Sequence, residues 1–245
     1  MRQLCALLAL LVATPAAAET MVVALSRAKV EVSSNFQGTE LALFGTIERD
    51  NQTVSRAGRY SIAVVVLGPA HDVLVQQKAR RFGLWVNASG TRYQSIPSYF
   101  AFLTTDQNPA TAAEALLDAN AGVAPTVHRF VRDQDPYFAA FREQRQAEQR
   151  VIIRGNGVAK LTGRFFRAII PLPGLVDDGA YRVRTILMRD GVVLDTNTLI
   201  FRVAKVGLEQ TLFAVSRERP LFYGLGVVLL ALVTGYVGGV VFRRR

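Results

Sequence analysis

The strongest constraint on the fold of this 245-residue chain is a pair of apolar segments, one near each end. After Arg2, residues 4–13 form a short apolar run, and Ala16 and Ala18 fit the small-x-small rule for signal peptidase. The run is too short to cross a bilayer. We therefore predict that residues 1–18 are a secretory signal peptide cleaved before Glu19, rather than an uncleaved anchor or a buried helix.

The second apolar segment, residues 221–242, contains no charged residue and is followed by three arginines. A helix of this length would extend for about 33 Å, enough to cross the hydrocarbon core. The pattern predicts a transmembrane helix over residues 220–242 and a basic cytoplasmic tail over residues 243–245. Gly235 and Gly239 form a small-xxx-small pair that could pack against another helix or a second copy of the chain, although glycine is common in such helices.

These two predictions place the remaining chain outside the cytoplasm. We expect a single-pass protein of the inner membrane, with residues 19–203 forming a β-rich region in the periplasm and the C-terminus in the cytoplasm. Leu208, Leu212 and Val215 repeat at helical spacing. This repeat predicts a juxtamembrane amphipathic helix over residues 204–219, with an ordinary connector as the alternative.

Composition excludes several classes of site. The single cysteine, Cys5, lies in the predicted signal peptide, so the mature chain can form neither a disulfide nor a thiolate site. Without Arg2 and the three terminal arginines, the formal net charge falls from +10 to +6. A basic exported surface favours inner-membrane lipid, acidic polymers or small oxyanions as partners. A nucleic-acid partner is not expected, because the chain shows no binding motif.

Alternating hydrophobicity predicts strands through most of the exported region. Ile62, Val64 and Val66 lie on one face of a strand whose other face is also apolar, which indicates burial on both sides. Asp190-Gly191 is a strong hairpin signal. The segment Gly179-x-Tyr181-x-Val183 is similar to the strand of immunoglobulin-like sandwiches in which the tyrosine forms a corner, and an ordinary core tyrosine is the alternative.

Two helix starts interrupt the strands, at Asn108-Pro109 and Asp135-Pro136, where an N-cap residue precedes a first-turn proline. We therefore predict a mainly β chain: an immunoglobulin-like β-sandwich with a helical pair inserted near residues 105–155, plus a single C-terminal transmembrane helix. Whether the exported region forms one domain or two stays open.

Catalytic and metal-binding patterns are scarce. His71 and His128 lie far apart and in no metal-binding spacing, and no nucleophile elbow or phosphate loop occurs in the exported part. We predict no metal, no cofactor and no enzymatic activity. A hydrolase that uses paired carboxylates stays a less favoured alternative; the available acids are Asp106, Asp118, Asp133, Asp135, Asp177 and Asp178.

Aromatic and basic residues are the candidate contacts for a ligand or partner. The first group comprises Trp85, Asn87, Arg92 and Tyr93, and the second comprises Arg164 and Arg167. An exposed aromatic ring beside an arginine can stack on a ligand. We nevertheless favour Trp85 and Tyr99 as anchors of the core.

Several motifs together resemble those of the alphaproteobacterial putative transmembrane protein family. They are Asn35-Phe36-x-Gly38-x-Glu40-Leu41-x-Leu43-Phe44-Gly45, Trp85-Val86-Asn87, Ile96-Pro97-Ser98-Tyr99, Phe165-Phe166-Arg167-Ala168-x-Ile170-Pro171-Leu172-Pro173 and Lys205-Val206-Gly207-Leu208-Glu209. The resemblance implies the same layout of signal, exported region and C-terminal helix, and provides no catalytic residues. Members tend to be encoded near a sulfite-exporter-like permease, which implies an accessory role beside an anion transporter.

The sequence thus predicts a non-enzymatic periplasmic protein held at the membrane, which acts as an interaction or accessory subunit beside an inner-membrane transporter. The alternative is a binding module for a small oxyanion or an acidic envelope polymer.

Overall fold

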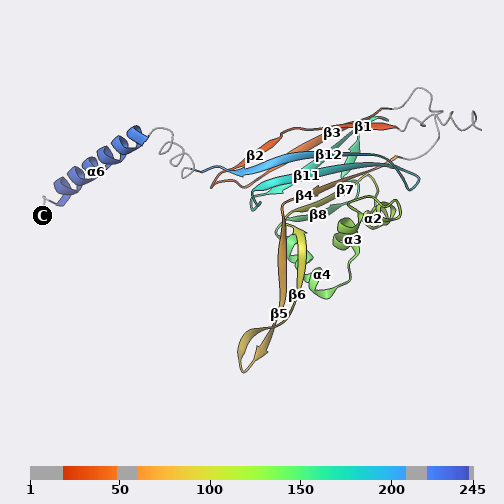
Figure 1. Cartoon of the computed structure of the whole chain (residues 1–245), viewed down its shortest axis with the longest axis horizontal. Coiled ribbons are helices and arrows are strands. Elements are labelled where there is room, and N and C mark those ends of the chain that lie inside the picture. The colour runs from red at the N-terminus through yellow and green to blue at the C-terminus, as the bar shows by residue number, and fades with distance from the viewer. Residues whose placement is uncertain (1–18, 49–59, 208–219, 243–245) are drawn as a thin grey trace, which may run out of the picture. The chain divides into compact units, whose positions relative to one another are not determined.

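The computed structural model describes residues 19–48, 60–207 and 220–242, and these residues are mainly in β-strands (Figure 1). They divide into two compact units. The first contains the described residues up to Val30 and residues 37–203, and the second contains residues 31–36 together with the described residues from Ala204 onward. Each unit is described by itself. The predicted signal peptide lies outside the described residues.

One antiparallel sheet has the strand order β1-β3-β10-β9. Its strands are β1 (Thr20–Leu25), β3 (Gly38–Glu48), β10 (Phe165–Pro173) and β9 (Val158–Lys160). Alternate residues of β3, including Leu41, Leu43 and Ile47, are buried. Gly45 in this row pairs with Phe166, and a Cβ at Gly45 would lie 2.1 Å from Cζ of the Phe166 ring. Glycine is therefore required there, because the ring occupies the space of a side chain.

The second sheet has the strand order β2-β12-β11-β4-β7-β8. Its strands are β2 (Lys29–Val32), β12 (Val192–Lys205), β11 (Gly179–Arg189), β4 (Tyr60–Leu67), β7 (Phe100–Thr104) and β8 (Val151–Arg154). The residues of β4 from Ile62 to Val66 are fully buried, which confirms the prediction of a strand covered on both faces. The predicted hairpin at Asp190-Gly191 is also confirmed: it joins β11 to β12, and both turn residues have positive φ.

Strand β8 pairs with β7 in parallel, so the chain must cross from one end of the sheet to the other between them. Three helices make this crossing: α2 (Pro109–Asp118), α3 (Ala124–Arg132) and α4 (Pro136–Ala147). Their apolar side chains form one buried cluster with residues of β4 and β7. The stacked rings of Phe100 and Phe130, 4.2 Å apart, lie within this cluster. The helices therefore cover a face of the second sheet.

Both predicted helix starts are confirmed. The side chain of Asn108 accepts a hydrogen bond from the Ala110 amide at 3.0 Å, and Asp135 accepts one from the Tyr137 amide at 3.0 Å. The prediction of a helical pair is wrong, because α3 lies between the two. Val123, at the N-cap of α3, makes no side-chain hydrogen bond to the helix. The usual polar signal for a helix start is therefore missing from the sequence.

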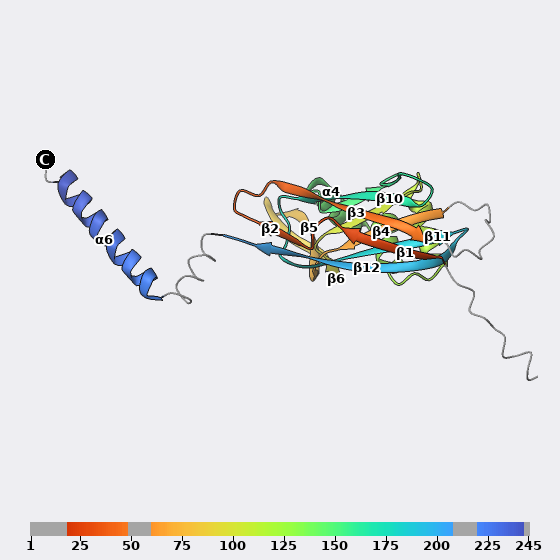
Figure 2. The ribbon, with the colours of Figure 1, turned by 90° about the horizontal axis from the view of Figure 1, so that it is seen from above.

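A long antiparallel hairpin forms a third, separate sheet, and Figure 1 shows it projecting away from the strands of the two larger sheets. Its strands are β5 (Ala70–Arg81) and β6 (Leu84–Pro97). We call this hairpin the arm. Figure 2, turned by 90°, shows β3 with β10 on one side of it and β1 on the other. Tyr99, between the arm and β7, donates a 2.5 Å hydrogen bond to the Pro171 carbonyl of β10 and so links the two larger sheets.

The predicted fold class needs two corrections. An immunoglobulin-like sandwich consists of two antiparallel sheets, whereas here a parallel pair closes a six-stranded sheet and helices cover it. The second unit contains the helix α6 (Pro220–Phe242). The predicted transmembrane helix is wrong: among the helices that the structure describes, none combines the length and apolarity needed for crossing a membrane.

Candidate functional site

The predicted contact residues do not form one site. Trp85, Asn87 and Arg92 lie exposed along β6 of the arm, and Trp85 is 70% exposed. The interpretation of Trp85 as a core anchor is therefore wrong, whereas Tyr99 is buried as predicted, with 1% exposure. The remaining two candidates are both exposed: Arg167 lies on β10 of the four-stranded sheet and Arg164 just before that strand.

Tyr93, the fourth candidate on β6, is buried and fixes the base of the arm to α4. Its ring lies edge-on to Phe138, with the ring centroids 5.3 Å apart. Its hydroxyl donates a 2.5 Å hydrogen bond to Asp135. Burial, reinforced by the Asp135 carboxylate, raises the pKa of Tyr93 to about 12. The same hydrogen bond lowers the pKa of Asp135. Farther along, the hydroxyls of Ser89 and Tyr137 lie 2.7 Å apart.

The end of the arm, residues 78–87, is the most exposed apolar feature of the first unit, and we call it the arm tip. Phe82 is fully exposed, and Leu84 and Trp85 are each 70% exposed. Phe82 and Gly83 both have positive φ, at 51° and 81°, so they form the tight turn between β5 and β6. Little in the local sequence indicates this turn, because phenylalanine rarely adopts positive φ.

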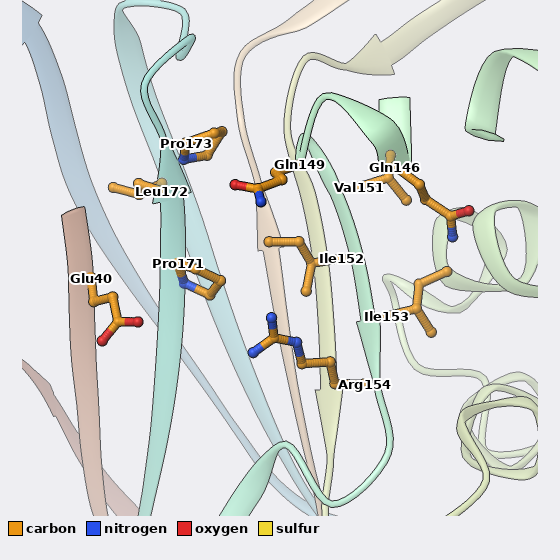
Figure 3. A pocket seen from close by; sticks show the side chains of 10 residues that line it. All are labelled: Glu40, Gln146, Gln149, Val151, Ile152, Ile153, Arg154, Pro171, Leu172 and Pro173. Carbon is orange, nitrogen blue, oxygen red and sulfur yellow. The ribbon is translucent and has the colours of Figure 1, made fainter. Parts of the chain in front are cut away.

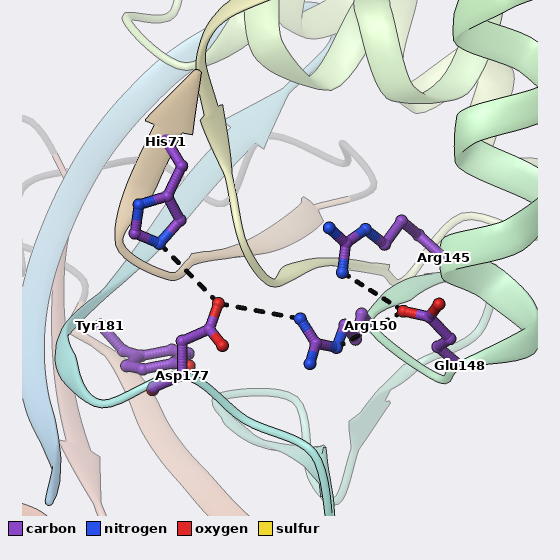
Figure 4. Close-up of polar contacts among 6 residues, drawn as sticks. All are labelled: His71, Arg145, Glu148, Arg150, Asp177 and Tyr181. Atoms are coloured by element: carbon purple, nitrogen blue, oxygen red, sulfur yellow. Dashed lines mark hydrogen bonds and ion pairs between the residues drawn. The ribbon is translucent and has the colours of Figure 1, made fainter. Parts of the chain in front are cut away.

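A chain of charged side chains connects the foot of the arm with the end of α4 (Figure 4). His71 Nε2 lies 3.8 Å from the Asp177 carboxylate, which is also 3.7 Å from Nη1 of Arg150. Arg150 Nε in turn lies 3.6 Å from Glu148. Because the carboxylates of Asp177 and Glu148 lie on either side of the Arg150 guanidinium, these charges compensate one another, and we interpret the chain as a structural support of the arm.

Tyr181 lies beside this chain and closes a corner. Its hydroxyl donates a 2.8 Å hydrogen bond to the carbonyl of Asp177, four residues upstream, and its ring stacks on Phe201. Burial raises the pKa of Tyr181 to about 12. Both interpretations of Tyr181 therefore hold, because it is a corner tyrosine and a core residue at once.

A groove of about 470 Å³ lies between β8 and β10 (Figure 3). Its wall on one side is the whole of β8, and its wall on the other is Pro171–Pro173 of β10; Glu40, Gln146 and Gln149 complete it. In Figure 3 the side chains of Gln149 and Arg154 point toward β10. Both charged residues of the groove, Glu40 and Arg154, are exposed. The sequence pattern did not predict this groove, which depends on the pairing of distant strands.

Comparison with known proteins identifies the family to which the chain belongs. A family model described as "Putative transmembrane protein (Alph_Pro_TM)" matches residues 20–244. The chain belongs to this family. The resemblance inferred from the motifs is therefore confirmed. No curated protein matches the chain.

The family's name refers to a membrane and names no reaction. In this member, the described residues contain no group of three or more His, Cys, Asp or Glu side chains able to hold a metal ion. Three of the candidate acids make structural contacts: Asp106 accepts from Ser61, Asp135 caps α4 and Asp177 pairs with Arg150.

The candidate helix-packing residues of this family member, Gly235 and Gly239, lie in α6. A Cβ added at either glycine would meet no atom within 4 Å among the described residues. Both positions are therefore open in this structure.

Proposed function

We propose that this protein is a non-enzymatic interaction protein of the bacterial envelope. In this proposal its β-rich body works on the periplasmic side of the inner membrane, as an accessory subunit beside an inner-membrane transporter. It binds an extended segment of that partner along the edge of β8. The motifs of the family and the open edge beside the groove support the proposal.

The observation that carries the proposal is the contrast between the two strands that border the groove. β9 pairs only with Phe166–Ala168, so in the described structure β10 has no neighbouring strand on that side from Ile169 onward. Two prolines, Pro171 and Pro173, occupy this free stretch and lack the amide needed for pairing. Proline is a known means of protecting a sheet edge.

The edge of β8 has no such protection. β8 is the last strand of its sheet, and its sequence Val-Ile-Ile-Arg is rich in β-branched residues. Because the Phe100 amide bonds to the Arg150 carbonyl, alternation along the ladder turns the backbone groups of Val151 and Ile153 away from β7. An unpaired edge of this kind can accept an added strand.

The groove sets limits on what can bind. Four residues of strand extend over about 13 Å, so β8 can pair with a short extended segment. Arg154 and Glu40 offer one positive and one negative contact beside it. A segment that carries both an acidic and a basic residue satisfies both. The alternative function, binding of a small oxyanion, has less support at this groove, because the Glu40 carboxylate repels anions.

The test uses photo-crosslinking in native membranes. In one variant a photoreactive residue replaces Arg154 in the groove. In a second variant of the same chain it replaces Val22, which is 52% exposed on the edge strand β1. We expect a specific adduct with a membrane protein from position 154 and none from position 22. Adducts of equal yield at both positions, or none at either, would contradict the proposal.

A proline variant tests the strand-addition geometry itself. Ile153→Pro removes an outward amide and leaves the ladder to β7 intact, so the folded state is expected to survive. Ile152→Pro removes a ladder amide and serves as the disruptive comparison. We expect Ile153→Pro to fold, as shown by circular dichroism, and to lose copurification of the partner. Copurification at the wild-type level by a folded Ile153→Pro protein would overturn the strand-addition geometry.

A further inference from the structure

We propose that the arm tip inserts into the interface of an anionic phospholipid bilayer. This inference concerns a surface remote in sequence from the β8 edge and goes beyond the proposed function. The ligand is the lipid itself: apolar side chains enter the boundary between headgroups and acyl chains, and basic side chains contact phosphate groups.

Within the part of the chain that the structure describes, no side chain buries the apolar part of the tip. Phe82 is fully exposed and forms the turn, and Leu84 and Trp85 follow at 70% exposure. A soluble surface rarely exposes a cluster of such residues unless it binds something apolar. Tryptophan is enriched at membrane interfaces, because its ring is apolar and carries one hydrogen-bond donor. Phenylalanine and leucine are typical of the apolar face of segments that lie in the interface.

The charged part of the tip has a single sign. Lys78, Arg80 and Arg81 are all exposed on β5. The register places Arg80 opposite Trp85 and Arg81 opposite Leu84, so each arginine accompanies one apolar residue. No Asp or Glu occurs between Asp72 and Asp106. Basic residues beside apolar ones are the combination that binds anionic membrane surfaces.

This charge pattern favours lipid over a protein surface. Specific protein interfaces pair charges of both signs and surround an apolar centre with a mixed polar rim. The tip has apolar residues along one strand and cations along the other, with no carboxylate to orient a protein partner. A bilayer of anionic lipids supplies an acyl region and a layer of phosphates, which match the two strands.

The stem of the arm holds the tip in position before any contact. Tyr93 is bonded to Asp135, and Ser89 lies 2.7 Å from Tyr137, so two points on α4 fix β6. Val73 and Val75 of β5 pack against the buried cluster of the helices. Insertion therefore needs no refolding of the arm, and little conformational entropy is lost on binding.

The chain provides its own reporter, because Trp85 is its single tryptophan. The full-length protein is mixed with preformed vesicles of phosphatidylcholine alone or of phosphatidylcholine with phosphatidylglycerol. We expect the Trp85 emission to shift to shorter wavelength in the anionic vesicles, and brominated acyl chains to quench it. Unshifted, unquenched emission in both vesicles would overturn the proposal.

Two variants separate the apolar and electrostatic contributions. Phe82→Ser with Leu84→Ser retains Trp85 and is expected to abolish the shift. Lys78→Gln with Arg80→Gln and Arg81→Gln is expected to weaken binding of the tip by on the order of a hundredfold, since each basic residue near such a surface contributes about fivefold.

The matched control is Arg164→Gln with Arg167→Gln, which removes exposed arginines from outside the arm. It is expected to leave the Trp85 emission unchanged. If this control reduces the shift as much as the change of the tip arginines, or if the shift requires an added membrane-protein extract, a lipid site at the tip is excluded. The crosslink from position 154 is measured on the same variants. A tip variant that loses the emission shift but retains this crosslink shows that lipid binding at the arm tip and partner binding at the β8 edge can be lost separately.

Discussion

Replacing Tyr93 by phenylalanine tests how the arm is held on the body. The change keeps the ring against Phe138 and removes only the hydroxyl that donates to Asp135. Loss of a hydrogen bond to a carboxylate that water can reach is expected to cost about 1 kcal/mol of unfolding free energy at pH 7. The assay is urea unfolding of the full-length protein in mild detergent, followed by far-ultraviolet circular dichroism.

The pH dependence makes this prediction sharper. Tyr93 has a pKa of about 12 in the folded protein against 10.0 for an ordinary tyrosine. The folded state therefore keeps this proton longer, and its stabilising contribution is complete below pH 10 and lost as the pH rises toward 12. The wild type loses about 1 kcal/mol from this residue by pH 11 and about 2 kcal/mol by pH 12. Tyr93→Phe has no hydroxyl to ionise and therefore does not lose this stability as the pH rises.

The two stability curves should consequently cross near pH 11, with Tyr93→Phe the more stable protein at pH 12. The other buried tyrosines are present in both proteins and cancel in the comparison. Tyr137→Phe, which removes the contact with the exposed Ser89, is the control and is expected to cost less than about 0.5 kcal/mol at pH 7. A constant difference between wild type and Tyr93→Phe from pH 7 to pH 12 would refute the reasoning.

Three further changes are checked by the same unfolding assay. Phe130→Ala should cost about 3–5 kcal/mol, because a fully buried ring stacked on Phe100 is removed; a cost below about 1 kcal/mol would show that the helical layer is loosely packed. Gly45→Ala should cost about 1–3 kcal/mol through collision with the Phe166 ring, and the double variant with Phe166→Leu should cost less than the sum of the single changes; full additivity would contradict the contact. Asn108→Ala should cost about 1 kcal/mol and Asn108→Asp only a few tenths, since aspartate also caps; equal losses would count against the cap.

Local rules predicted those elements whose signals lie within a few residues. The N-caps at Asn108 and Asp135, the turn at Asp190-Gly191 and the two-faced burial of β4 all follow from short sequence patterns, and the structure confirms them. In each case the local preference and the tertiary environment agree.

The elements that the sequence patterns did not predict are those whose formation depends on contacts with distant parts of the chain. The turn at Phe82-Gly83 has nearly the same φ values as the turn at Asp190-Gly191, but phenylalanine in the first position is not a turn signal. Helix α3 lacks a capping side chain, so no local signal marks the start of the helix that buries Val127 and Phe130.

The candidate site could be predicted only in part. Trp85 and Val86 are residue types that are common in buried strands, and whether they are covered depends on what the fold places beside them. Trp85 is exposed because the distal part of the arm extends past the helices, a fact of geometry with no local signature. The groove likewise results from β8 and β10, which belong to different sheets.

The parallel pairing of β8 has a consequence for the order of events in folding and opening. The strand β8 can join β7 only after the chain has passed through α2, α3 and α4, so closing this contact costs more loop entropy than closing a hairpin. We therefore expect β8 to dock late and to detach early, with amides that exchange with solvent faster than those of β4. The wall of the groove would then be the part of the sheet that opens most readily, where an incoming strand needs to displace the least structure.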